Sequence, residues 1–194
     1  MLKDNAVLIG EGSYGKVYSN GDGTVTKVVQ IDSTPYEELL PSLYYGRKNI
    51  EGVAKALAIK VDYHSANSGT VYIVKEELAK NATVEGILNR VMKVWDDSLV
   101  NSHNLFDFIE QYLKGNQKTV FRDTRSVKEF MKCLNFNAPR CAPVFLDLVS
   151  IVEELKSEGI YNVDWNIENF GWRFETGKLT MFELGEARYK KKIV

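Results

Sequence analysis

The sequence predicts an α+β fold in which an antiparallel sheet is followed by a mainly helical part. The first 80 residues contain short runs of apolar and β-branched residues separated by polar turns, which is typical of strands. Residues 84–157 instead show apolar residues at helical spacing, and the tail returns to one hairpin at residues 170–174 and 179–182. No linker interrupts the 194 residues, so we expect a single domain.

The first three strands are expected at residues 6–9, 16–19 and 24–29, where apolar or β-branched side chains cluster. The second and third strands are joined by Asn20-Gly21-Asp22-Gly23, whose residues tolerate the positive φ angles of a hairpin turn. This part of the chain therefore predicts a small antiparallel sheet.

A short helix and two more strands should complete that sheet. Residues 35–46 suit a short helix, which Pro41 should break or kink. Strands are expected at residues 53–61 and 70–74, with the polar segment 64–69 between them.

The middle of the chain predicts helices. Helical periodicity occurs at residues 84–95, 103–114 and 125–134. The clearest helix starts near Pro143 and should end at Gly159, which can adopt the left-handed conformation of a C-terminal cap. One face of that helix is apolar and contains Val144, Phe145, Leu148, Val149, Val152 and Leu155.

Composition and charge exclude several classes of protein. With 25 Lys+Arg against 26 Asp+Glu the net charge is −1, which argues against a nucleic-acid partner. No apolar run reaches the ~20 residues that span a bilayer, and the N-terminus lacks the apolar core of a signal peptide. The spacing of Cys133, Cys141, His64 and His103 fits neither a disulfide framework nor a zinc finger. We therefore expect a cytoplasmic protein without a membrane partner.

A glycine motif lies between the first two expected strands. Residues 10–17, Gly-Glu-Gly-Ser-Tyr-Gly-Lys-Val, match G-x-G-x-x-G-x-V in full. A dinucleotide-binding fold would require a helix directly after the third glycine, and a strand and hairpin follow here instead. Glycines between two strands can cover ATP phosphates, because they let backbone N–H groups approach closely. Lys27 in the next strand could reach those phosphates. Taken alone, the motif also suits an ordinary turn and Lys27 an exposed strand lysine.

Further polar residues follow the last expected helix. Asp164 and Asn169 are five residues apart, which is the spacing of the kinase catalytic loop H-R-D-x-x-x-x-N. Such an aspartate orients an attacking hydroxyl and accepts its proton, and the amide oxygen binds Mg²⁺. Glu183, in the segment Phe182-Glu183-Leu184-Gly185, stands where kinases have D-F-G.

These three fragments, in this order, resemble a protein-kinase-like fold over roughly residues 6–188. The resemblance implies two lobes: an antiparallel sheet lobe at residues 1–78 and a reduced helical lobe at residues 79–194. The short chain is similar to the kinases of lytic bacteriophages, which would place it in the host cytoplasm.

The resemblance also implies the cofactors ATP and Mg²⁺ and a role for each site residue. Lys27 would bind the phosphates, Asp164 would orient the acceptor hydroxyl, and Asn169 and Glu183 would hold Mg²⁺. The catalytic set is therefore Asp164, Lys27 and Asn169.

The expected nucleotide contacts extend beyond these groups. Glu38 or Glu37 of the first helix would pair with Lys27, and the main chain of the hinge Glu76-Glu77-Leu78 would hold adenine. The residues expected to bind ATP are Gly10, Gly12, Ser13, Gly15, Val17, Lys27, Glu38, Glu76 and Leu78.

Several positions depart from the family pattern. Asn166 replaces the lysine that usually neutralises the γ-phosphate, which should slow transfer because such charges stabilise the transition state. Glu183 is one methylene longer than the usual aspartate, and Gly171 lies where the family has an apolar residue beneath adenine. Only nine residues follow Gly185, so we expect the usual peptide-docking parts to be absent.

Three functions remain open at this point. The first is an ATP-dependent phosphotransferase similar to a Ser/Thr protein kinase, acting on a protein substrate. The second is a pseudokinase, a module that binds a protein partner with weak or no catalysis. The third is transfer of AMP in place of phosphate.

Overall fold

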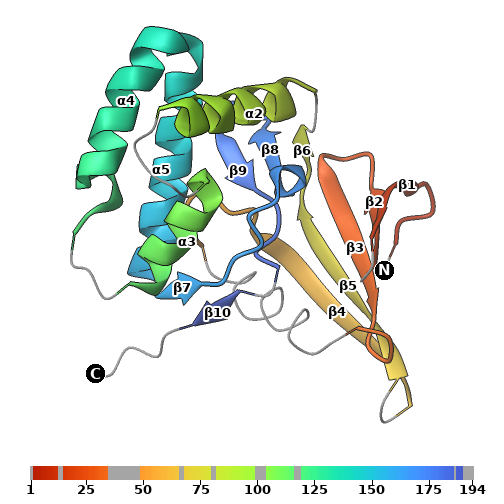
Figure 1. Cartoon of the computed structure of the whole chain (residues 1–194). Coiled ribbons are helices and arrows are strands. Elements are labelled where there is room, and N and C mark those ends of the chain that lie inside the picture. Colours follow the sequence, from red (N-terminus) through yellow and green to blue (C-terminus); the bar gives the residue numbers. More distant parts are fainter. Residues whose placement is uncertain are drawn as a thin grey trace.

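A computed structural model of the chain describes residues 2–12, 15–34, 49–65, 68–79, 82–98, 104–115, 119–185 and 187–189. These ranges form an α+β fold in which a five-stranded antiparallel sheet lies beside four α-helices (Figure 1). The helix expected at residues 35–46 lies outside the described residues, as do Ser13, Glu37 and Glu38.

The five-stranded sheet contains the glycine motif and Lys27. Its strands pair in the order β1-β2-β3-β5-β4. They are β1 (Val7–Gly12), β2 (Gly15–Ser19), β3 (Thr24–Gln30), β4 (Ala56–Ser65) and β5 (Ser68–Glu76). In the β1–β2 hairpin the last pair is Gly12 with Gly15, so the glycine motif forms its tip. The expected strands at residues 6–9, 16–19, 24–29 and 70–74 are confirmed, with ends shifted by a few residues.

The turn expected between β2 and β3 is also confirmed. Gly21 and Gly23 have φ angles of 73° and 79°, which are the positive values that glycine adopts without strain. The Asp22 carboxylate accepts a hydrogen bond from the backbone N–H of Thr24 at 3.2 Å, so the turn is fixed from within.

The strand expected at residues 53–61 begins later than the sequence suggested. β4 starts at Ala56, and Val53 instead forms a parallel bridge with Met181. The backbone N–H of Ala54 donates to the Met181 carbonyl at 2.8 Å, and that of Met181 donates to Gly52 at 2.8 Å. These contacts tie the sheet to a hairpin near the end of the sequence, a tertiary pairing that local propensity cannot reveal.

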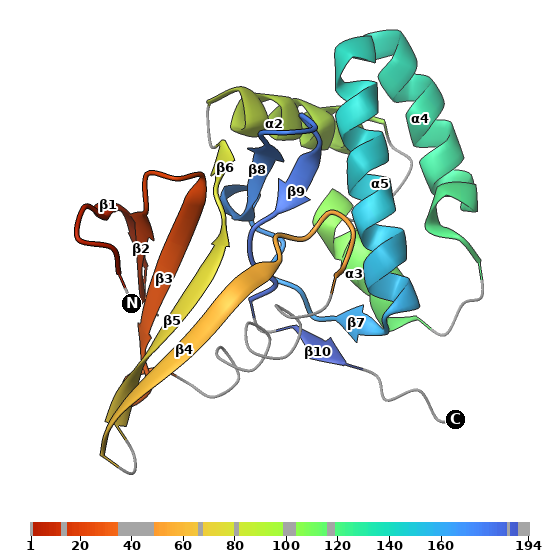
Figure 2. The ribbon, with the colours of Figure 1, turned by 180° about the vertical axis from the view of Figure 1, so that it is seen from behind.

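The four helices expected between residues 84 and 159 are confirmed. They are α2 (Ala82–Asp97), α3 (Leu105–Lys114), α4 (Arg125–Asn137) and α5 (Ala142–Ser157). Gly159 follows α5 with φ 73°, as expected of a C-terminal cap. Seen from behind, α4 and α5 run side by side (Figure 2).

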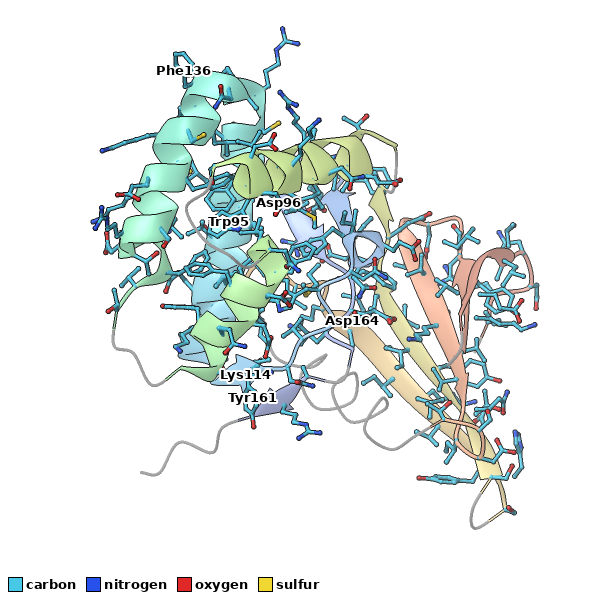
Figure 3. The ribbon with its side chains drawn as sticks, in the orientation of Figure 1. Trp95, Asp96, Lys114, Phe136, Tyr161 and Asp164 are labelled. Carbon is cyan, nitrogen blue, oxygen red and sulfur yellow. The ribbon has the colours of Figure 1, made fainter. Side chains whose placement is uncertain are left out.

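The helices pack around one large apolar core. Trp95 of α2 (Figure 3) is 1 % exposed and contacts the ring of Phe130 edge-on, with 4.8 Å between the ring centroids. Phe130 in turn contacts Phe145 of α5 at 4.8 Å. Edge-to-face aromatic pairs of this kind contribute about 1 kcal/mol each beyond the area they bury.

Short strands complete the fold and position the site. β6 (Leu78–Ala79), β8 (Phe170–Arg173) and β9 (Leu179–Met181) form one small sheet, and β7 (Ile160–Tyr161) pairs with β10 (Arg188–Tyr189). The late hairpin is therefore confirmed as β8–β9, whereas β6, β7 and β10 were not expected as strands. None of the helices in the described ranges is long and apolar enough to cross a membrane.

Candidate functional site

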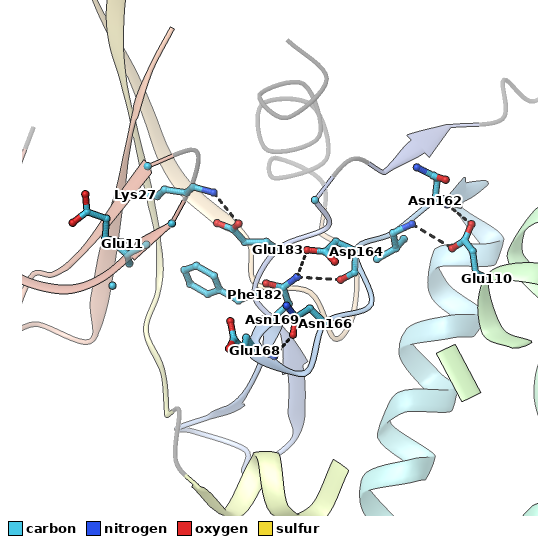
Figure 4. Close-up of a pocket in the computed structure, with 16 residues that line it drawn as sticks. Glu11, Lys27, Glu110, Asn162, Asp164, Asn166, Glu168, Asn169, Phe182 and Glu183 are labelled. Carbon is cyan, nitrogen blue, oxygen red and sulfur yellow. Dashed lines mark hydrogen bonds and ion pairs between the residues drawn. The ribbon is translucent and has the colours of Figure 1, made fainter. Parts of the chain in front are cut away.

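A cavity of about 750 Å³ lies between the sheet and the segments that surround β8 and β9 (Figure 4). Its walls come from the β1–β2 hairpin, from β3, from α3 and from the two loops at residues 162–169 and 182–185. The lining residues are Gly10, Glu11, Gly12, Gly15, Val17, Lys27, Glu110, Asn162, Val163, Asp164, Asn166, Glu168, Asn169, Phe182, Glu183 and Gly185.

The glycine motif covers one side of this cavity. Gly10, Gly12, Gly15 and Val17 all line it. Gly15 has φ 155°, and a Cβ there would lie 2.5 Å from the Val28 carbonyl oxygen, so a side chain is excluded at this position.

Lys27 on β3 and Glu183 after β9 meet inside the cavity. The Lys27 ammonium donates to the Glu183 carboxylate at 2.8 Å, and the two side chains are 16 % and 20 % exposed. The β8–β9 hairpin brings Glu183 to the sheet, because the Met181 backbone is bonded to residues just before β4. A charge-assisted hydrogen bond with little solvent around it is stronger than the same pair on the surface.

A second lysine, Lys75 on β5, lies close to this ion pair. The sequence analysis did not predict it as a residue near the site. It is 3 % exposed, and its ammonium donates to the Phe182 carbonyl at 2.8 Å and lies 4.8 Å from the centroid of the Phe182 ring. Burial lowers the pKa of Lys75 from 10.5 to about 8; the positive charge of Lys27 adds to this effect and the negative charge of Glu183 opposes it. The one feature of the sequence that could have pointed to Lys75 is that it ends the apolar run of a central strand.

Asp164 and Asn169 face each other across the loop that follows β7 (Figure 4). The Asn169 side-chain amide donates to the Asp164 carboxylate at 3.0 Å and to its backbone carbonyl at 3.0 Å. With the amide nitrogen used in this way, the amide oxygen of Asn169 is the atom available to a cation. The side chain of Asn166 accepts from the backbone N–H of Glu168 at 3.0 Å, so it caps the short 3₁₀ turn Ile167–Asn169.

Gly185 fits tightly against the loop that contains Asp164. Its φ angle is 57°, and a Cβ at Gly185 would lie 2.4 Å from the Asp164 Cβ. The backbone N–H of Asp164 donates to the Leu184 carbonyl at 3.3 Å, which joins the same two segments. The glycine thus permits Glu183 and Asp164 to line one cavity.

Glu110 of α3 is a further cavity residue that sequence reasoning missed. Its carboxylate accepts from the backbone N–H groups of Asn162 at 2.6 Å and Val163 at 3.3 Å, and from the Trp165 indole N–H at 3.1 Å. Glu110 also pairs with Lys114 one turn along α3 at 3.4 Å, as an exposed helix carboxylate would. The local sequence does not reveal its role in the cavity, because the loop residues that it binds lie more than 50 residues away.

The expected hinge residues lie outside the cavity lining. Glu76 makes a two-point ion pair with Arg173, with distances of 2.7 and 3.0 Å. The backbone N–H of Glu77 donates to Gly23, and Leu78 is buried and packs with Val25 and Phe182. Of the residues that the structure describes, the cavity lining includes neither Glu76 nor Leu78.

The departure at Gly171 has a packing reason. A Cβ at Gly171 would lie 2.7 Å from the Cβ of Leu78 across the β6–β8 pair. Leu78 therefore occupies the space that a side chain at position 171 would need, and glycine is the residue that fits there.

The described lining of the cavity is strongly acidic. Its carboxylates are Glu11, Glu110, Asp164, Glu168 and Glu183, and among these described residues Lys27 supplies the positive charge. Within the described ranges no three His, Cys, Asp or Glu side chains are grouped to hold a metal ion. The Asn169 amide oxygen and the Glu183 carboxylate are nevertheless the hard oxygen donors that Mg²⁺ prefers.

Comparison with known proteins gives no family assignment. No model of a protein family matches the chain, and no curated protein matches it.

Proposed function

We propose that this protein is an ATP-dependent phosphotransferase with a minimal, two-lobed protein-kinase-like fold. The observation on which this rests is the meeting of Lys27, Asp164, Asn169 and Glu183 around one cavity beneath a glycine motif. Lys27 and Glu183 are 156 residues apart in the sequence, so their convergence is a property of the fold.

The position of each group supports a kinase-like arrangement. In protein kinases a glycine-rich loop covers the ATP phosphates and the phosphate-binding lysine is on the third strand. Here the motif forms the tip of the β1–β2 hairpin, and Lys27 is on β3. The sheet residues 1–78 and the residues 79–194 would then form the two lobes.

The proposed chemistry transfers the γ-phosphoryl group of ATP to a hydroxyl and releases ADP. Lys27 binds the phosphates, and Asp164 orients the acceptor hydroxyl and takes its proton. The Asn169 amide oxygen and the Glu183 carboxylate would hold Mg²⁺, which supplies positive charge against the phosphates. We expect a protein acceptor and a cytoplasmic location, where ATP is supplied.

The side chain of Asn166 favours one alternative, a pseudokinase that binds a protein partner. Asn166 caps the Ile167–Asn169 turn and supplies no charge to the cavity. Among the lining residues that the structure describes, Lys27 is then the one cation that faces five carboxylates. Transition-state stabilisation by fixed cations is worth several kcal/mol in phosphoryl transfer, so turnover without a second cation would be slow.

Labelled ATP with Mg²⁺ or Mn²⁺ separates these functions. The phosphotransferase predicts label on the protein or on an added acceptor, and loss of that label in Asp164→Asn. The same substitution at Asp62, which lies on β4 and pairs with Lys60, should leave transfer unchanged. Equal labelling of wild type and Asp164→Asn would refute the proposal, and the mass of the product distinguishes phosphate from AMP.

A further inference from the structure

We propose that Glu110 on α3 is a positioning residue for the transfer reaction, because its carboxylate fixes the backbone of the loop that presents Asp164. The inference rests on the proposed phosphotransferase function and concerns the same cavity. Glu110 lines that cavity, and its side chain is 15 % exposed.

The contacts of Glu110 flank Asp164 on both sides. One carboxylate oxygen, Oε2, accepts from the Val163 backbone N–H at 3.3 Å and from the Trp165 indole at 3.1 Å. Val163 and Trp165 are the residues directly before and after Asp164. A single anionic atom therefore holds the chain on either side of the proposed catalytic aspartate.

The other oxygen of Glu110 supports an unfavourable backbone conformation. Asn162 has φ 59°, the one positive φ of a non-glycine residue in the described chain, and such a conformation is unfavourable for a residue with a Cβ. Its N–H donates to Glu110 Oε1 at 2.6 Å. Hydrogen bonds to a carboxylate are stronger than those between neutral groups, so this bond helps to offset the cost of the strained turn.

α3 supports the same loop through a second, apolar contact. Phe106 of α3 stacks on Trp165 with 5.8 Å between ring centroids and 26° between ring planes. Trp165 also stacks on Phe170 at the start of β8. Two residues of α3 therefore hold the Trp165 indole: Phe106 through the ring stack and Glu110 through the hydrogen bond to its carboxylate.

Asp164 is bonded to Asn166 and Asn169 within its own loop, but its hydrogen bond to a residue outside that loop is longer. Its backbone N–H donates to the Leu184 carbonyl at 3.3 Å, near the outer limit for this type of bond. Loss of Glu110 would therefore let the Asp164 carboxylate shift, and a misplacement of about 1 Å costs roughly a hundredfold in rate.

Glu110→Gln tests this role, because glutamine keeps the shape and replaces one acceptor oxygen with an NH₂ group that cannot accept. Hydrogen exchange should become at least tenfold faster at the amides of Asn162 and Val163 in this variant and unchanged in α5. The kcat for transfer should fall by about a hundredfold, while the KM for ATP stays within twofold of wild type. Glu110→Ala should enlarge both effects.

Glu85→Gln is the matched control, since Glu85 is exposed on α2 and does not line the cavity. It should leave exchange and kcat unchanged. Unchanged exchange at residues 162–163 in both Glu110 variants would overturn the proposed role of Glu110. An equal loss of kcat and ATP affinity would also overturn it, because that result indicates general loosening of the fold.

The exchange measurement also separates this inference from the proposed function. If the wild type shows no transfer that depends on Asp164, the phosphotransferase is refuted whatever Glu110 does. Faster exchange in the variants would then establish Glu110 as a loop anchor only, and its part in catalysis would be rejected.

Discussion

Lys27 and Glu183 form a partly buried ion pair, with 2.8 Å between ammonium and carboxylate, that joins β3 to the segment after β9. Both residues line the cavity, and their charges act on the pKa of the buried Lys75. The Glu183 carboxylate therefore interacts with both Lys27 and Lys75 in a region with little solvent exposure. The stability of the protein and the pKa of Lys75 both depend on this carboxylate.

The first prediction concerns the strength of this ion pair. In a double-mutant cycle of Lys27→Met and Glu183→Gln, we expect a coupling of about 1–2 kcal/mol in the free energy of unfolding. Denaturant unfolding of the four proteins measures it. The surface pair Lys60–Asp62, with side chains 47 % and 34 % exposed, should couple by less than about 0.5 kcal/mol. Equal coupling in both cycles would contradict the partial burial of the Lys27–Glu183 pair.

The second prediction concerns Gly185. An alanine there places a Cβ 2.4 Å from the Asp164 Cβ in addition to the strain of φ 57°, so we expect Gly185→Ala to destabilise the protein by more than about 2 kcal/mol and to abolish transfer. Gly177→Ala has a similar φ of 63° but no atom within 4 Å, and should cost only about 1 kcal/mol. Equal losses of stability would show that the contact with Asp164 is unimportant.

Much of the fold could be predicted because local signals and tertiary packing agree. β2 and β3 follow from β-branched residues on either side of an Asn-Gly-Asp-Gly turn, and the Gly21 and Gly23 φ angles satisfy that turn. α5 follows from an apolar face that the core does bury. The convergence of Lys27, Asp164, Asn169 and Glu183 could be proposed only from motif order, and here it is seen as shared lining of one cavity.

The remaining features depend on contacts between distant parts of the chain. Val53 leaves the expected strand because its partner, Met181, lies far along the sequence. Glu110 and Lys75 resemble an ordinary helix carboxylate and a strand lysine until their partners are known. Such pairings leave no periodicity in the sequence, so patterns of hydrophobicity cannot reveal them.

The third prediction is a pH dependence of stability caused by Lys75. Because burial lowers its folded-state pKa to about 8, the unfolded chain binds one more proton than the folded protein between pH 8 and 10.5. The free energy of unfolding therefore rises with pH across this window, and the penalty of the buried charge is fully present below pH 8. Denaturant unfolding at pH 7 and pH 10 should show wild type gaining about 2 kcal/mol relative to Lys75→Met.

That comparison isolates Lys75 from other titrating groups. Tyr112, whose pKa is raised to about 12 mainly by burial, is present in both proteins and cancels in the difference. A difference between the two proteins that does not change with pH would contradict a depressed pKa at Lys75.

The fourth prediction concerns the metal. If Glu183 helps to hold Mg²⁺, Glu183→Gln should keep the thermal stabilisation that ATP gives alone and lose the additional stabilisation that Mg²⁺ adds. Glu51→Gln, at a carboxylate that is 75 % exposed, is the control and should behave as wild type. Retention of the Mg²⁺ effect in Glu183→Gln would remove Glu183 from the metal site.

Thermal unfolding with and without Mg²⁺-ATP, in wild type and in Lys27→Met, tests most directly whether the cavity is one triphosphate site. Ligand that binds the folded state raises the melting temperature by mass action. We predict a rise that depends on ATP concentration in wild type and in Lys60→Met, and a loss of most of that rise in Lys27→Met. No rise in wild type, or an equal rise in Lys27→Met, would contradict the site described here.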